Sequence, residues 1–289
     1  MIHATNHRRL LRAGFRVRSV PTPHGEMKVY DARGTSGGPT LVLVHGVSSR
    51  ASTYARVATS LLRQCGRVVI PDLIGHGDSH VPASGLRIHS IDEALTTTLD
   101  DIVPEPMVVV GNSMGGLVAG LYVAARPWRV RGLVLSNPGG APVEPDVFYR
   151  AVGLLTPSNH TEALRLAKAG SSFQSRLILH LGARNVLRNL GRPHIRNFLL
   201  TATPDESLTA EQVGRFDMPV LLLTGTDDGV IPDETLRWYR DHLPRHAVIR
   251  EVDHFGHAPM SERPAVLARH IRGFLAELER PTQTEAAAR

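Results

Sequence analysis

The sequence predicts an α/β fold, a doubly wound and mostly parallel sheet that carries an inserted all-helical segment. Three observations predict it. Short apolar runs alternate with helical segments along most of the 289 residues, as in βαβ units. Two of these runs, 40–44 after its first residue, Thr40, and 107–110, are apolar at every position, which is typical of strands covered on both faces. The alternation stops between 142 and 207, where no strand is evident and short amphipathic segments follow one another.

The composition is that of an ordinary globular protein, with 42% hydrophobic and 21% charged residues. The net charge is +6, but the positive charges are scattered arginines without a basic run, which argues against a nucleic-acid partner. Cys65 is the only cysteine, so no intramolecular disulfide or thiolate metal site is expected. Residues 1–10 lack the apolar region of a signal peptide, and no apolar run approaches 18 residues. We therefore expect a cytoplasmic protein without a membrane span; its oligomeric state is not readable from the sequence.

The first half of the chain predicts an edge hairpin followed by the first parallel strands. Residues 1–14 are expected to be an irregular arm with an amphipathic stretch at Leu10 and Leu11. Residues 15–20 alternate apolar and polar positions, and with 27–30 they predict an antiparallel pair. The elements that follow are expected to be strand 40–44, helix 54–62, strand 67–70, helix 91–102 and strand 107–110.

The second half resumes the sheet after the helical insertion. Helices are expected at 117–125, 147–155, 162–169, 173–181, 195–200, 234–242 and 264–278, and strands at 130–135, 218–223 and 247–252. The chain is thus divided into a core of 1–141 and 208–280, a helical cap of 142–207 and a disordered tail of 281–289. Ligands of open α/β sheets bind outside the carboxyl ends of the strands, so the cap is expected to shape the pocket.

The turn at 111–116 has the sequence Gly-Asn-Ser-Met-Gly-Gly and joins a buried strand directly to a helix rich in small residues. So short a turn forces Ser113 into a strained conformation, which Gly111 and Gly115 make possible because they lack side chains. The Ser113 hydroxyl is then exposed at the carboxyl end of a strand, in front of a helix N-terminus that can stabilise an anion. This is the arrangement that a nucleophilic serine needs.

A second strand, 40–44, ends at His45 and Gly46, where glycine allows a sharp bend. The backbone N–H of Val47 is therefore a candidate oxyanion donor. The alternative is a plain strand-to-helix turn with a hydrogen-bonded His45.

The loop at 72–79 contains Asp72, His76 and Asp78, which raise the possibility of a metal site or an acid–base pair. Aspartates beside proline and glycine more often serve turn hydrogen bonds, so neither a metal nor another cofactor is expected.

The candidates for a general base and its carboxylate also follow strands. Asp227 and Asp228 come after strand 218–223, and His254 and His257 after the last strand. A nucleophilic serine needs a neutral imidazole to take its proton and a carboxylate to orient that imidazole. The residues alone leave both choices open, with a slight preference for His257 because Gly256 frees its backbone.

The order serine, aspartate, histidine resembles that of the α/β-hydrolase superfamily over about 15–278. Five motifs carry the resemblance, namely His-Gly at 45–46, Asp-Leu-Ile-Gly-His-Gly-Asp-Ser at 72–79, the 111–116 turn, Gly-Thr-Asp-Asp-Gly-Val-Ile-Pro at 225–232 and Gly-His-Ala-Pro at 256–259. The family patterns select Asp228 over Asp227 and His257 over His254. The resemblance further implies an oxyanion hole formed by the backbone N–H groups of Val47 and Met114.

The resemblance also implies a reaction. Dehalogenases and epoxide hydrolases of the superfamily use aspartate where Ser113 stands, so neither activity is expected. A serine implies an acyl-enzyme and a carboxylic ester, or related acyl bond, of a small and largely apolar substrate. The sequences of the 111–116 turn and of Asn-Pro-Gly-Gly at 137–140 also resemble those of hydrolases that cleave carbon–carbon bonds of ring-fission products. If this chain had that activity, its Arg176 or Arg184 would be expected to meet a carboxylate of the substrate.

These relatives usually place an aromatic residue directly after the histidine, where this chain has Ala258, so the ester hydrolase comes first. A ligand-binding protein that has the hydrolase fold but no catalytic activity is a third possibility. The side chains expected to line the pocket are His45, Ser48, Asn112, Asn137 and Ala258.

Overall fold

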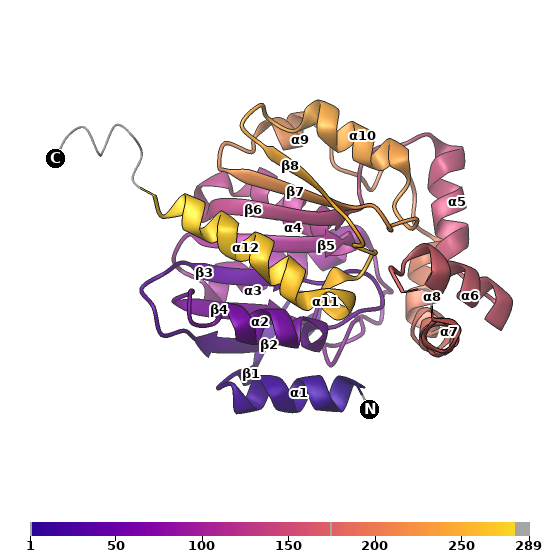
Figure 1. Cartoon of the computed structure of the whole chain (residues 1–289), viewed down its shortest axis with the longest axis horizontal. Helices are drawn as coiled ribbons and strands as arrows, with labels where there is room; N and C mark the ends of the chain where they lie inside the picture. Colours follow the sequence, from indigo (N-terminus) through magenta and orange to yellow (C-terminus); the bar gives the residue numbers. More distant parts are fainter. Residues whose placement is uncertain (1, 174, 281–289) are drawn as a thin grey trace.

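The computed structural model describes residues 2–173 and 175–280, so the tail expected at 281–289 lies outside the described residues. Its centre is an eight-stranded sheet in the order β1-β2-β4-β3-β5-β6-β7-β8 (Figure 1). The strands are β1 (Arg16–Thr22), β2 (Gly25–Arg33), β3 (Thr40–Val44), β4 (Arg67–Pro71), β5 (Met107–Ser113), β6 (Val130–Pro138), β7 (Val220–Gly225) and β8 (Val248–Val252). Strand β2 runs antiparallel to its neighbours β1 and β4, and the other neighbouring strands are parallel. The predicted mostly parallel, doubly wound sheet is confirmed.

Helices cover both faces of this sheet (Figure 1). One face carries α1 (Ile2–Arg12), α2 (Ala55–Leu61), α11 (Pro259–Glu262) and α12 (Pro264–Leu278), and the other carries α3 (Ile88–Ile102), α4 (Met114–Ala125), α9 (Ala210–Gly214) and α10 (Asp233–His242). Two short 3-10 helices, η1 (Ala51–Tyr54) and η2 (Pro127–Arg129), precede α2 and β6. None of the helices among the described residues is long and apolar enough to cross a membrane.

The central strands bury both faces, as their unbroken apolar runs predict. In β3, Val42 and Val44 belong to the core beneath α3 and α4, whereas Leu41 and Leu43 belong to the core beneath α2 and α12. Successive side chains of a strand point to opposite faces, so an apolar residue is needed at each position. The result is a rigid central platform whose parallel strands share one carboxyl edge.

The N-terminal segment differs from the expected irregular arm, because 2–12 form the helix α1. Leu10 is fully buried, and the side chain of His7 hydrogen-bonds the Tyr30 hydroxyl over 2.7 Å. Most helical stability in proteins comes from tertiary packing of this kind. The prediction was therefore wrong because the partners of this helix lie elsewhere in the chain.

The cap consists of α5 (Pro145–Leu155), α6 (His160–Ala169), α7 (Arg176–Leu190) and α8 (Pro193–Leu200), beyond the carboxyl edge of the sheet (Figure 1). The third of these helices differs from its prediction, since it begins at Arg176 and continues through Gly182 to Leu190. Gly182 lies against Ala167 of α6, and an added Cβ at 182 would meet the Cβ of Ala167 at an ordinary contact distance of 3.7 Å. A glycine that disfavours an isolated helix is thus compensated by packing.

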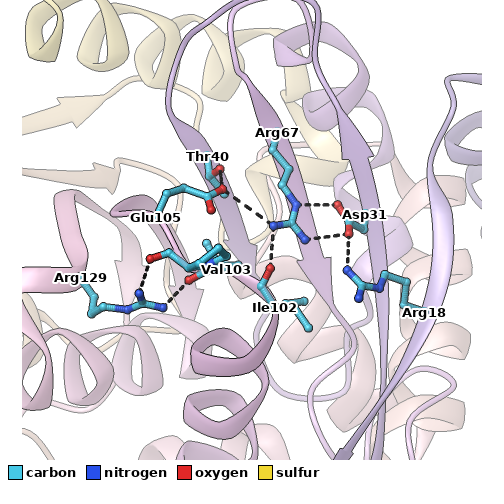
Figure 2. Close-up of polar contacts among 9 residues, drawn as sticks. Arg18, Asp31, Thr40, Arg67, Ile102, Val103, Glu105 and Arg129 are labelled. Atoms are coloured by element: carbon cyan, nitrogen blue, oxygen red, sulfur yellow. Dashed lines mark hydrogen bonds and ion pairs between the residues drawn. The ribbon is translucent and has the colours of Figure 1, made fainter.

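At the amino ends of the parallel strands, opposite the cap, ionic contacts join neighbouring strands (Figure 2). Arg67, at the start of β4, donates two hydrogen bonds of 2.9 and 2.8 Å to the carboxylate of Asp31 in β2. Arg18 of β1 donates to the same carboxylate, and Glu105 accepts from Thr40. Paired guanidinium and carboxylate groups of this geometry form the stronger class of hydrogen bonds. They join the antiparallel edge to the parallel strands, far from the carboxyl edge.

Candidate active site

The turn 111–116, called the elbow below, places Ser113 at the carboxyl end of β5 and directly before α4. Ser113 has φ 57° and ψ −127°, a conformation that costs a non-glycine residue roughly 1–3 kcal/mol. A Cβ atom on Gly111 would overlap the carbonyl oxygen of Gly115, and one on Gly115 would overlap that of Val44. The glycines are therefore required by the close approach of backbone segments, as the sequence predicts.

Three side chains from three strand ends form a continuous hydrogen-bonded chain at this edge. The Ser113 hydroxyl donates to Nε2 of His257 over 3.0 Å, and Nδ1–H of His257 donates to Oδ2 of Asp228 over 2.9 Å. The other carboxylate oxygen of Asp228 accepts the backbone N–H groups of Val230 and Ile231. Asp228 is thereby fixed on both oxygens and orients the imidazole toward the serine.

Electrostatics at His257 favour its protonated form. Burial alone lowers the pKa of His257, but the charge of Asp228, its hydrogen bond and the charge of Glu262 together raise that pKa above the ordinary 6.5. A raised pKa makes the imidazole a stronger proton acceptor, provided that the solution pH leaves it neutral. His257 is thus suited to take the proton of a hydroxyl.

The competing pair lies apart from Ser113. His254 Nδ1 is 3.7 Å from Oδ2 of Asp227, and the His254 side chain is 78% exposed. The His254 backbone has a positive φ of 55°, and its N–H donates to the hydroxyl of Thr226. The structure therefore brings Asp228 and His257 to the serine, whereas Asp227 lies beside the exposed His254.

Val47 and Met114 line the same cavity as Ser113, which is described below. The N–H of Val47 has no acceptor among the described residues. Met114 is the first residue of α4, where an N–H lacks an intrahelical acceptor. A Cβ atom on Gly46 would lie 2.9 Å from the Cβ atom of Ser113, which shows how closely the end of β3 approaches the elbow.

Asn112 and Asn137, both expected at the pocket, instead bind backbone. The Asn112 amide donates to the carbonyl oxygens of Ser136 and His257, over 2.9 and 3.0 Å. The Asn137 amide donates to the carbonyl of Gly256 and accepts the N–H of Gly225. Neither side chain lines the cavity. Their contacts join the elbow and β6 to the segments that carry Asp228 and His257.

The other three expected pocket residues are also absent from the cavity lining. His45 is fully buried, donates to the Gly46 carbonyl and accepts the N–H of Leu73, and burial lowers its pKa to about 4. This is the hydrogen-bonded histidine of the alternative interpretation. Ser48 has a positive φ of 58° in the turn after Gly46, and Ala258 packs toward the α12 side of the sheet.

The loop at 72–79 uses its polar residues for internal bonds. The Asp72 carboxylate accepts the N–H groups of Ala51 and Asp78, over 2.6 and 2.9 Å, and His76 bonds the Ile74 carbonyl. No group of three or more histidine, cysteine, aspartate or glutamate side chains suited to a metal occurs in the part of the chain that the structure describes. Asp72 therefore binds backbone of its own loop and of η1, whereas the Asp78 carboxylate lies 3.6 Å from the Arg50 guanidinium.

One cap segment, 169–172, contacts the site directly, and the sequence analysis did not identify it. The carbonyl of Gly170 accepts the N–H of His257 over 2.9 Å, and the carbonyl of Ala169 accepts the N–H of Gly229 over 2.7 Å. Glu262 of α11 accepts both the N–H and the hydroxyl of Ser172, over 3.0 and 2.9 Å. These bonds are between segments far apart in sequence and follow no motif, so no local pattern predicts them.

A cavity of about 160 Å³ opens above Ser113 between the sheet and the cap. Most of its lining is apolar, and the cap supplies a large share of it, namely Val143, Phe148, Ala151, Val152, Leu155, Phe198 and Leu199. Glu206 is the only charged side chain of the described residues that lines it. The cavity therefore suits an apolar group and offers no cation to an anionic one.

The chain also matches known hydrolases in sequence. The model of the family described as serine aminopeptidase, S33, matches residues 38–264. The chain is 30% identical to a pimeloyl-[acyl-carrier protein] methyl ester esterase of Nitrosomonas europaea, over 80% of this chain and 93% of that one. It is 26% identical to Lipase 1 of Psychrobacter immobilis, over 91% and 85% of the two chains.

Among solved structures, the chain is similar to a membrane phospholipase A described as a bacterial virulence factor. The TM-score is 0.79 at 25% identity, covering 97% of this chain and 92% of that one. The family match spans well over half of the sequence, and the fold is the same. The chain therefore belongs to the serine aminopeptidase S33 family of α/β hydrolases.

Proposed function

We propose that the protein is a carboxylic-ester hydrolase in which Ser113 is the nucleophile, His257 the general base and Asp228 the carboxylate that orients it. The single observation that carries the proposal is the unbroken hydrogen-bonded chain from the serine hydroxyl to the buried carboxylate. The relatives named as an esterase and a lipase support the choice of an ester bond.

The reaction follows from the positions of these atoms. Ser113 Oγ attacks the ester carbonyl while its proton passes to Nε2 of His257, and the imidazolium is stabilised by Asp228. Collapse of the tetrahedral intermediate breaks the bond to the alcohol oxygen, which leaves with the proton held by His257. Water then attacks the acyl-enzyme by the same steps and releases the acid and free Ser113.

We assign the oxyanion hole to the backbone N–H groups of Val47 and Met114. The support is their place beside the elbow and, for Val47, the lack of any other acceptor among the described residues. Donors fixed in advance of the reaction stabilise the developing negative charge, and loss of one typically lowers kcat about 100- to 1000-fold.

The cavity favours a neutral substrate with a short or medium acyl chain. Its volume is close to that of an engineered apolar cavity of about 150 Å³ that binds benzene. The only charged lining side chain, Glu206, repels carboxylates rather than attracting them.

Carbon–carbon hydrolysis of ring-fission products is the second candidate, which the sequence of the elbow favours. Its substrate carries a carboxylate, and the arginines expected to meet it, Arg176 and Arg184, lie on α7 and do not line the cavity. Asn112 binds backbone instead of the cavity. Ester hydrolysis is therefore the function that the geometry supports better.

The test is turnover of p-nitrophenyl esters of increasing acyl length. Ser113→Ala should abolish turnover, and Asp228→Asn should lower kcat by about 10⁴-fold because the imidazole loses its orientation. The matched controls are the neighbours Asp227→Asn and His254→Asn, which should leave turnover intact. Asparagine is chosen at 254 because it tolerates the positive φ.

Two results would overturn the assignment: full turnover in Ser113→Ala, or equal losses in the Asp227 and Asp228 variants. A fluorophosphonate separates the enzyme from a silent ligand-binding protein, because it labels only an activated serine. Wild type should be labelled and Ser113→Ala should not.

A further inference from the structure

Helix α7 lies beside α6 and α8 in the cap (Figure 1), and it exposes apolar side chains to solvent. Leu177, Ile178 and Leu181 are 70%, 46% and 55% exposed, whereas Leu179 and Ala183 on its other side are buried. The helix thus uses one face to pack on the rest of the cap and leaves a second apolar face without a partner among the residues that the structure describes. Grouped apolar side chains at the surface of a protein commonly mark an interaction site.

The same exposed face is basic farther along the helix. Leu177, Leu181, Arg184 and Arg188 follow at intervals of four, three and four residues and therefore lie on one stripe of the helix. We call Leu177, Ile178, Leu181, Arg184 and Arg188 the α7 surface.

The surroundings strengthen this positive charge. Between 163 and 204 the sequence contains seven basic residues and neither aspartate nor glutamate; the seven are Arg165, Lys168, Arg176, Arg184, Arg188, Arg192 and Arg196. Within the described part of the chain, none of the seven forms an ion pair with a carboxylate. Arg184 and Arg188 of the α7 surface are exposed, so their charge is available to an external anionic partner.

From this combination we propose that the α7 surface docks the protein reversibly on an anionic phospholipid bilayer. Leucine and isoleucine side chains enter the boundary between headgroups and acyl chains, while Arg184 and Arg188 meet lipid phosphates. A second copy of the chain fits less well, because it would bring two equally basic surfaces together. A stable dimer also needs about 800 Å² from each partner, far more than three side chains supply.

The docking is separate from the proposed chemistry, because none of the α7 surface lines the cavity. A soluble ester therefore reports the integrity of each variant, and vesicle binding reports the docking. Failure of the esterase proposal would leave this inference untouched, and the reverse also holds.

The experiment is co-sedimentation of the full chain with vesicles of phosphatidylcholine alone or mixed with equal parts of phosphatidylglycerol. We expect binding to the mixed vesicles only, and weaker binding at high salt. Leu177→Ser with Leu181→Ser, and separately Arg184→Gln with Arg188→Gln, should each weaken it by about tenfold or more.

The matched control is Trp128→Ser, which removes a side chain that is 72% exposed, in η2 at the amino end of β6. It should bind vesicles like wild type. The inference is overturned if wild type does not sediment with the mixed vesicles, or if the control loses as much binding as the α7 variants. It is equally overturned if the α7 substitutions change the oligomeric state in gel filtration and leave vesicle binding unchanged.

Discussion

Substituting Gly46 by alanine tests how closely β3 and the elbow must meet. The added Cβ would lie 2.9 Å from the Cβ of Ser113 and 3.2 Å from the carbonyl oxygen of Asn112. Ordinary contact between carbon atoms is about 3.5–4.0 Å, so the two segments must separate by roughly 0.6–1.1 Å. Neither group can rotate away, because one is a Cβ and the other is backbone.

This separation should lower both stability and catalysis. Overpacking of this size costs about 1–3 kcal/mol in the free energy of unfolding. The next residue, Val47, carries a proposed oxyanion donor, and a displacement near 1 Å in an active site can lower the rate by about 100-fold. We therefore expect kcat for p-nitrophenyl butyrate to fall by about 100-fold in Gly46→Ala, with little change in KM.

The control is Gly273→Ala in α12, where an added Cβ meets no atom within 4 Å. Alanine in a helix interior should raise the free energy of unfolding by about 0.5–1 kcal/mol and leave kcat unchanged. The assay combines steady-state kinetics with thermal melting of both variants. A folded Gly46→Ala protein with the kcat of wild type would refute the reasoning about the close approach.

Two further predictions concern the residues around His257. Because Asp228 and Glu262 raise the pKa of His257 above 6.5, kcat/KM should fall as the pH drops through a pKa above that value. Glu262→Gln should move this acid limb to lower pH, whereas Ser172→Ala, which keeps the charge, should not; an unmoved limb in Glu262→Gln contradicts the prediction. Asn137→Ala removes two buried bonds and should cost about 2–3 kcal/mol in urea unfolding, together with part of kcat. An unchanged unfolding midpoint would contradict it.

The sheet was predictable because its sequence signal is local. Strands β3 and β5 are apolar at each of their central positions, and a strand buried on both faces requires that pattern. Helix α12 is found at the predicted bounds, since its apolar stripe and Pro264 at its start both lie within one short segment.

Helices that are stabilised by contacts with segments far away in the sequence were not predictable in the same way. Helix α1 contains Asn6 and two adjacent arginines rather than a long apolar stripe, and its order depends on Leu10 and His7 meeting other segments. The α7 helix continues through Gly182 because α6 packs against that point. Tertiary packing decides such cases, and the sequence does not reveal it.

In the candidate site, too, the features set by local sequence could be predicted and those set by distant contacts could not. The elbow could be identified from its glycines, because a side chain at these positions would overlap nearby backbone atoms. The choice of Asp228 over its neighbour came from family resemblance, and none of the five side chains expected to line the pocket does so. Asn112 and Asn137 looked like pocket residues because they stand at strand ends, yet their amides satisfy backbone groups of other segments.

Different parts of the cap contact the proposed catalytic residues and line the cavity. Segment 169–172 is hydrogen-bonded to the loops that carry the proposed base and carboxylate and to α11, and these hydrogen bonds fix its position beside the proposed site. Helices α5 and α8, by contrast, supply much of the apolar lining. Substrate preference can then diverge through changes in α5 and α8 while the hydrolytic machinery stays intact. An engineer seeking a new ester should accordingly vary Phe148, Val152 and Phe198 first and leave 169–172 alone.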